Sequence, residues 1–169
     1  AKPFHIKSWV EGHRLVRSGA EFTIHTQVQQ DNLLVWDAEM IILSRAVKGH
    51  GQKELRQDPF VQNPSLCEQW RFPFEQGRRY AKVSGDYNPI HLSPLVAKIF
   101  GMPRHIIHGM YSVGKVISIL PKTVSDVSAS FQRPIFLPSS VEFLANQKQF
   151  LIRSLKNGKT HLSGYYKSE

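Results

Sequence analysis

The chain has 169 residues, of which 41% are hydrophobic, and a formal net charge of +9 at pH 7. This length suits one sizeable domain or two small ones, and the apolar content is ordinary for a globular protein. No apolar run is long enough to span a bilayer, and the scattered basic residues form no nucleic-acid-binding signature, so neither a membrane nor a nucleic acid is an expected partner.

Alternating apolar and polar residues predict strands throughout residues 1–46. The clearest run places five apolar side chains on one face: Leu34, Trp36, Ala38, Met40 and Ile42. Period two over this length predicts a half-buried strand. We expect a bend at residues 14–19 and a hairpin turn at residues 30–32, and no helix before residue 47.

Residues 47–72 are mostly polar, and a structureless stretch of this length is uncommon inside a compact domain. We therefore interpret them as a linker. Cys67, the single cysteine, lies in this stretch and is expected to be an incidental thiol. Because one cysteine cannot form an internal disulfide, a reducing compartment such as the cytoplasm is expected.

A dense group of functional side chains follows a short helix predicted near residues 74–83. Asp86, Asn88 and His91 lie within six residues, and Pro89 fixes the backbone between them. Asn-Pro predicts a turn, which can bring the carboxylate and the imidazole toward a common point. Such a pair can move protons, although the same residues could simply cap a turn.

Helical and strand patterns continue to the end of the chain. Residues 93–100 predict a short helix, and Gly109 to Pro121 a central helix. Its expected buried stripe consists of Val113, Val116, Ile117 and Leu120. Gly114 in this helix suggests close packing of the sheet at that point. Strands are expected over residues 125–167, with a hairpin turn at Asn157-Gly158.

Two separated motifs resemble those of the MaoC-like dehydratases, the (R)-specific enoyl-CoA hydratase family. The first is Tyr80 followed by Ser84-Gly85-Asp86, Asn88-Pro89 and His91; the second is His108-Gly109-Met110; the resemblance continues through residues 131–138. It covers residues 73–169 and implies an α+β hotdog domain, in which a long central helix is wrapped by a curved antiparallel sheet.

The resemblance also implies a double-hotdog arrangement, with residues 1–46 as a degenerate half-hotdog. The first repeat of such proteins normally has a central helix upstream of its strands. We therefore expect either a further N-terminal segment before Ala1 or a naturally reduced repeat. Hotdog units usually pair, so a homodimer or a pseudo-dimer of repeats is expected.

By resemblance, the reaction is reversible addition of water to a trans-2-enoyl thioester, giving an (R)-3-hydroxyacyl thioester. Asp86 and His91 would activate the water in either order of roles, and the Gly109 N–H would stabilise charge on the thioester oxygen. Further substrate contacts are expected from Asn88, His108 and Met110. One departure stands out: the family's serine on the central helix is replaced by Ile117, with Ser118 next to it.

Three points stay open at the level of sequence. The substrate carrier is coenzyme A or an acyl carrier protein, and the acyl length is not defined. A hotdog thioesterase and a non-catalytic acyl-thioester-binding module are the alternative functions. No cofactor and no metal are expected. His91, His105 and His108 could together suggest a metal site, but zinc ligands usually follow tighter patterns.

Overall fold

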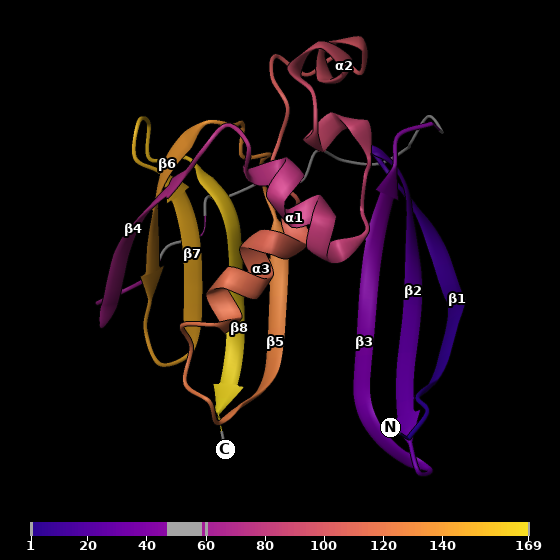
Figure 1. Ribbon diagram of the computed structural model, residues 1–169. Helices are drawn as coiled ribbons and strands as arrows, with labels where there is room; N and C mark the ends of the chain where they lie inside the picture. The colour runs from indigo at the N-terminus through magenta and orange to yellow at the C-terminus, as the bar shows by residue number, and fades with distance from the viewer. Residues whose placement is uncertain (1, 47–58, 60, 169) are drawn as a thin grey trace. The chain divides into compact units, whose positions relative to one another are not determined.

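The computed structural model describes residues 2–46, 59 and 61–168. The chain divides into two compact units, Ala1–Arg56 and Gln57–Glu169. Figure 1 shows the strands and helices of each unit. Among the described residues, no helix has both the length and the apolar character needed to cross a bilayer.

The first unit is a three-stranded antiparallel sheet in the order β1-β2-β3. Its strands are β1 (His5–Val16), β2 (Gly19–Gln30) and β3 (Leu33–Ser44). The predicted hairpin turn is confirmed: Asp31 and Asn32 have φ angles of 53° and 62°, the left-handed pair that a tight hairpin requires. The predicted bend is shorter than expected, because β1 continues to Val16. Residues 2–46 contain no helix, as predicted.

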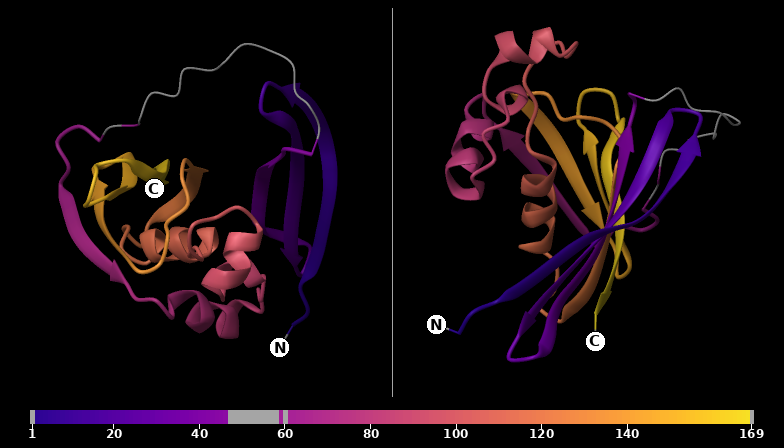
Figure 2. Two further views of the ribbon diagram at one scale, coloured as in Figure 1. Left: turned by 90° about the horizontal axis from the view of Figure 1, so that it is seen from above. Right: turned by 90° about the vertical axis from the view of Figure 1, so that its right-hand side faces the viewer.

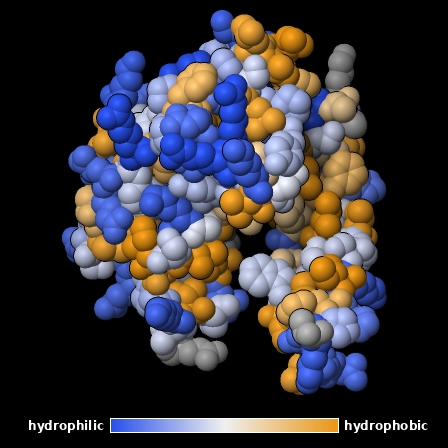
Figure 3. Space-filling model, viewed as in Figure 1, coloured by the Kyte–Doolittle hydropathy of each residue, from blue (hydrophilic) through white to orange (hydrophobic). Residues whose placement is uncertain are grey.

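The alternation in β3 is confirmed by its register with β2, but its expected burial is wrong. Trp36 pairs with Val28 and Met40 pairs with Ile24, so the apolar side chains share one face. The two β3 side chains are nevertheless exposed, at 59% and 52%. A sheet without a helix in the same unit leaves this face uncovered, and apolar patches are visible over β1–β3 in Figure 3.

The second unit has a five-stranded antiparallel sheet in the order β4-β6-β7-β8-β5. Its strands are β4 (Leu66–Phe72), β5 (Val124–Phe131), β6 (Ser139–Ala145), β7 (Gln149–Ser154) and β8 (Thr160–Ser168). The hairpin predicted at Asn157-Gly158 is confirmed between β7 and β8, with Gly158 at φ 68°.

The predicted linker, residues 47–72, requires one correction. Leu66–Phe72 form β4, an edge strand of the second unit that pairs with β6 along its whole length. Burial alternates along the strand, but only Trp70 and Phe72 are fully buried, while Leu66 and Glu68 are half-buried. Residues 47–58 and residue 60 of the predicted linker lie outside the described residues.

Four helical segments belong to the second unit: α1 (Gln76–Ser84), the 3-10 helix η1 (Pro89–His91), α2 (Pro94–Ile99) and α3 (Gly109–Ile117). Figure 2 shows the sheet curving around α3, with α1 and α2 on the same side of the sheet. This helix-on-sheet arrangement is the hotdog fold expected from the sequence. The central helix is shorter than expected, with nine residues.

The buried stripe of α3 is confirmed at three of its four positions. Val113, Val116 and Leu120 are buried in the core cluster, together with Phe72 and Phe143 of the sheet. The prediction was wrong for one position, since Ile117 is 42% exposed. It was also wrong about close packing at Gly114, because an added Cβ would meet no atom within 4 Å.

The entry to α3 is fixed by backbone hydrogen bonds on two sides. On one side, Ile107 donates to the Ile135 carbonyl at 2.9 Å, and Leu137 donates to the His105 carbonyl at 3.0 Å. On the other, the Ile106 N–H donates to the carbonyl of Ile90 in η1 at 3.1 Å. The start of α3 is therefore tied to the segment that carries the Asp86–His91 motif.

Candidate active site

The Asp86–His91 loop is shaped by its own side chains. The helix α1 ends at Gly85, whose φ of 75° reverses the chain direction. Asp86 then uses Oδ1 to accept from the Asn88 N–H at 3.1 Å, and Asn88 uses Oδ1 to accept from the Ile90 N–H at 3.3 Å. These bonds wind the loop into η1, so His91 turns back toward Asp86 as the proline turn predicted.

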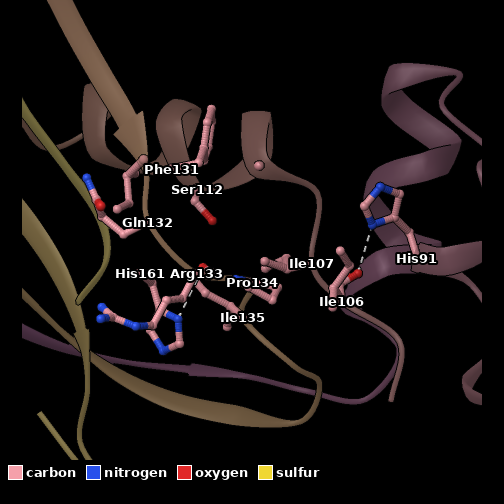
Figure 4. Close-up of a pocket in the computed structure, with 12 residues that line it drawn as sticks. His91, Ile106, Ile107, Ser112, Phe131, Gln132, Arg133, Pro134, Ile135 and His161 are labelled. Atoms are coloured by element: carbon pink, nitrogen blue, oxygen red, sulfur yellow. Dashed lines mark hydrogen bonds between the residues drawn. The ribbon is translucent and has the colours of Figure 1, made fainter. Parts of the chain in front are cut away.

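His91 is buried and held in a defined tautomer. Its Nδ1 donates to the Ile106 carbonyl oxygen at 2.9 Å, so the neutral ring carries its lone pair on Nε2. Figure 4 shows this bond at one side of a cavity. Burial is the largest effect and lowers the pKa of His91; the Ile106 bond opposes it, and His108 lowers and Asp86 raises the pKa by smaller amounts. A neutral imidazole with a free lone pair can accept a proton near pH 7.

His108 joins the loop to the start of α3. Its Nε2 donates to the backbone carbonyl of Asp86 at 3.0 Å and lies 3.8 Å from the carboxylate Oδ2. Its ring stacks on His91 with centroids 3.8 Å apart, and the Tyr80 ring meets it edge-on at 5.0 Å. His108 is 2% exposed. It therefore fixes the relative position of Asp86 and His91 from inside the protein.

Asp86, His91 and His108 also form a group whose potential metal-ligand atoms all lie within 4.8 Å of one another. Asp86 takes the place of His105 in the set weighed from sequence, because the His105 Nε2 is bonded to the Phe74 carbonyl at 2.8 Å. The His108 nitrogen that faces Asp86 carries the hydrogen of its bond to the Asp86 carbonyl, so it is not free to ligate an ion that Asp86 holds. A metal-free site stays our prediction.

A cavity of about 260 Å³ adjoins this cluster at the N-terminus of α3. The cavity is lined by the polar residues His91 and Ser112 and by Gly109, which has no side chain. Its apolar lining residues include Ile106, Ile107, Phe131, Pro134, Ile135 and Leu162. The first N–H groups of a helix have no acceptor within the helix and lie at the positive end of its dipole. The cavity can therefore hold an apolar chain next to donors for an oxygen that gains negative charge.

The packing of the Phe131 ring leaves no room for a side chain at position 109, whatever ligand the cavity holds. A Cβ at this position would lie 2.7 Å from the Phe131 Cε1 atom, closer than carbon atoms approach without a shift. The Phe131 ring thus packs directly on the start of α3, on the side of the cavity opposite His91 in Figure 4.

The remaining predicted site residues lie elsewhere. Asn88 caps η1 with its side chain, which favours a structural role. Met110 is 55% exposed and lines a separate groove of about 520 Å³ between α1 and α3, together with Arg79 and Lys115. Asp86 adjoins His91 but is not among the residues that line the cavity, and its side chain is 53% exposed.

Sequence reasoning missed four polar residues of the cavity: Ser112, Gln132, Arg133 and His161. Ser112 lies three positions after Gly109, a helical spacing that places both on one face and could have indicated it. His161 comes from β8, and its Nδ1 faces the Arg133 carbonyl at 3.4 Å. Burial is the main cause that lowers the pKa of His161. A single histidine at the start of a strand gave no signal.

The family model described as "MaoC like domain" matches residues 59–164 of the chain. Among curated proteins, 3-hydroxyacyl-thioester dehydratase X of Mycobacterium tuberculosis is 34% identical over 163 residues, which cover 90% of this chain and 58% of that protein. Peroxisomal enoyl-CoA hydratase 2 of Arabidopsis thaliana is 35% identical over 86 residues, covering 46% of this chain and 27% of that protein. The chain thus spans less than two thirds of the length of either relative.

Two solved structures share the fold over nearly the whole chain. The crystal structure of HtdX from Mycobacterium tuberculosis superposes with a TM-score of 0.81 at 27% identity, covering 99% of this chain and 70% of that one. The peroxisomal multifunctional enzyme type 2 of Drosophila melanogaster superposes with a TM-score of 0.77 at 18% identity, covering 98% of this chain and 34% of that one. The second likeness concerns the fold alone.

Proposed function

Since the chain belongs to the MaoC-like domain family, we propose that it is a hydro-lyase that adds water reversibly to a trans-2-enoyl thioester and forms the (R)-3-hydroxyacyl thioester. The observation that carries this proposal is the meeting of Asp86 and His91 beside the N-terminus of α3, at a cavity with mostly apolar walls. The named relatives, a 3-hydroxyacyl-thioester dehydratase and an enoyl-CoA hydratase, support the reaction class.

In the proposed hydration step, a water molecule lies between Asp86 and His91. The His91 Nε2 lone pair accepts a proton from the water while the water oxygen bonds to C3. The nearby Asp86 carboxylate stabilises the imidazolium that forms. Electron density from the C2–C3 double bond moves to the thioester oxygen. The His91 imidazolium then gives its proton to C2, which completes the hydration and leaves the imidazole neutral again. Dehydration is the same sequence in reverse.

The helix α3 supplies the electrostatic part of this mechanism. The Gly109 N–H stands at the first position of α3, where the helix dipole adds to its positive partial charge. A hydrogen bond to the thioester oxygen there becomes stronger as negative charge develops on it, which lowers the barrier. In other enzymes, loss of one such donor costs about 2.7–4 kcal/mol.

The net charge of +9 suits an anionic carrier, and both coenzyme A and an acyl carrier protein are anionic. We therefore propose an acyl thioester substrate without choosing between these carriers. Pairing of hotdog units, across chains or between repeats, is also part of the proposal, because within the part of the chain that the structure describes the sheet ends at the edge strands β4 and β5.

The test is the loss of enoyl absorbance when crotonyl-CoA or a longer 2-enoyl-CoA is added, with Asp86→Asn as the variant. Asparagine keeps the oxygen that accepts from the Asn88 N–H, so the loop should hold while the charge is lost. We expect the rate to fall by about 10²–10⁴-fold, the usual contribution of acid–base catalysis, because His91 loses the carboxylate that stabilises its protonated form.

The matched control is Asp126→Asn. Asp126 is exposed on β5, about 17 Å along the strand from Phe131, and should leave the rate unchanged. Release of a free thiol instead of loss of the double bond would point to a thioesterase. Binding without turnover on any carrier would indicate a non-catalytic module, and full activity in Asp86→Asn would refute the mechanism.

A further inference from the structure

Ser112 shares one face of α3 with Gly109. The two residues are three positions apart in α3, and both line the cavity beside His91. Figure 4 shows the Ser112 hydroxyl pointing from the helix toward the interior of the cavity. The serine is thus placed one helical turn beyond the N–H proposed to bind the thioester oxygen.

The Ser112 Oγ is buried and has no hydrogen-bond partner among the described residues. Serines within helices commonly bond back to a carbonyl of the preceding turn, as the Ser84 hydroxyl in α1 does to the Tyr80 carbonyl at 3.0 Å. A buried hydroxyl without a partner destabilises the folded protein. The unpaired Ser112 hydroxyl therefore lowers the stability of the folded protein, and a hydrogen-bond partner inside the cavity would remove this loss.

The other polar side chains that line the cavity already have partners within the chain. His91 bonds to the Ile106 carbonyl and Gln132 to the Ser130 hydroxyl. Arg133 bonds to the Thr160 carbonyl and His161 to the Arg133 carbonyl. An acyl thioester offers few acceptors to the remaining hydroxyl. Its chain is apolar, and the oxygen at C3 lies with Asp86 and His91 in the proposed mechanism, which leaves the thioester carbonyl oxygen.

We propose that the Ser112 hydroxyl donates a hydrogen bond to the thioester carbonyl oxygen, as a second donor beside the Gly109 N–H. This assignment rests on the proposed hydro-lyase function. Two donors on one face of α3 hold the carbonyl in one orientation, and both bonds strengthen as the oxygen gains charge. The hydroxyl is kept without a partner in the free protein because the substrate supplies one.

The experiment compares Ser112→Ala with Ser118→Ala in the full chain. Ser112→Ala should lower kcat for crotonyl-CoA hydration by about 10²–10³-fold with little change in KM, the pattern of an interaction made mainly in the transition state. Ser118→Ala, at the C-terminal cap of the same helix and away from the cavity, should leave both constants unchanged. An active parent with an equally active Ser112→Ala variant would overturn the assignment and leave the proposed function standing.

Two further readouts do not require turnover. The thermal midpoint of Ser112→Ala should rise by about 2–4 °C, because alanine removes the unpaired hydroxyl and favours the helix. Butyryl-CoA, which has no double bond to hydrate, should raise the midpoint of the parent more than that of Ser112→Ala. A parent that hydrates no enoyl thioester would sink the proposed function, whereas a lower midpoint in Ser112→Ala, or equal shifts by butyryl-CoA, would overturn the role of Ser112.

Discussion

Gly77 has no side chain, which lets helix α1, the helix before Asp86, pack directly against η1, the segment that carries His91. It is buried in α1, where a Cβ would lie 2.0 Å from the His91 carbonyl oxygen and 3.0 Å from the carbonyl carbon. Ordinary contact begins at 3.4 Å, so Gly77→Ala would force α1 and η1 apart by about 1.4 Å. Both neighbours are backbone atoms within helical segments, and no side-chain rotation can relieve the clash.

The expected loss of stability follows from two opposing effects. Alanine gains up to about 1 kcal/mol over glycine in a helix, and overpacking costs about 1–3 kcal/mol or more. Gly77→Ala should therefore lose about 1 kcal/mol or more, which lowers the thermal midpoint by about 2–4 °C for each kcal/mol. Displacement of His91 by about 1 Å should also reduce the hydration rate by about 10²-fold.

Gly114→Ala is the matched control, because it makes the same change in another helix of the second unit. An added Cβ at Gly114 would meet no atom within 4 Å, so only the helix-propensity gain remains. The thermal midpoint should rise by about 2–4 °C with activity unchanged. Circular dichroism melts measure the thermal midpoint, and the crotonyl-CoA assay measures the hydration rate. If Gly77→Ala proved as stable and as active as Gly114→Ala, the packing argument would fail.

Two further predictions concern histidines whose pKa is lowered by burial. If neutral His91 accepts the proton of water, kcat/KM should fall at low pH with a midpoint below 6.5, the ordinary pKa of the group; a midpoint above that value would exclude His91 as the base. The lowered pKa of His161 means that its contribution to stability is present above pH 6.5 and is lost as pH falls through the folded-state pKa. His161→Gln should therefore lose less stability than the parent between about pH 7 and pH 5 in urea unfolding; an equal loss would contradict this.

Features with local causes could be predicted from the sequence. Both hairpins use residue types that tolerate left-handed backbone angles, which Asp31 and Asn32 take in the first hairpin and Gly158 takes in the second. Ser93 caps α2 by accepting from the Val96 N–H, with Pro94 at the first helical position. In each case two adjacent residues determine the geometry, so no tertiary information was needed.

Features that depend on distant partners could not be predicted. The strand β4 looks like part of a polar loop, because an edge strand that buries only Trp70 and Phe72 needs little apolar sequence. Its pairing with β6 joins residues more than 65 positions apart, and sequence patterns carry no sign of such pairing. The exposure of Ile117 has the same origin: periodicity gives the face of a helix but not how far the sheet extends beneath it.

The candidate site was predictable in its chemistry but not in its full membership. The turn at Pro89 correctly predicted that Asp86 and His91 approach each other, while their catalytic roles stay predictions. Ser112 was missed because a serine within an apolar helical stripe is as compatible with a small core residue as with a ligand contact. Only the structure shows that its hydroxyl lacks a partner.

The unpaired polar atoms of the described core belong to residues that lie close together in the sequence. Buried side-chain atoms without a partner are His105 Nδ1, His108 Nδ1 and Ser112 Oγ, all within residues 105–112 at the entry and first turn of α3. The surrounding core is apolar and well packed, so these atoms are not a sign of a loose interior. A chain selected only for stability would have paired or removed them, and departures of this kind concentrate at functional sites. Of these three atoms, only the Ser112 Oγ belongs to a residue that lines the cavity, so it is the one whose unused hydrogen-bonding capacity a polar substrate group can satisfy.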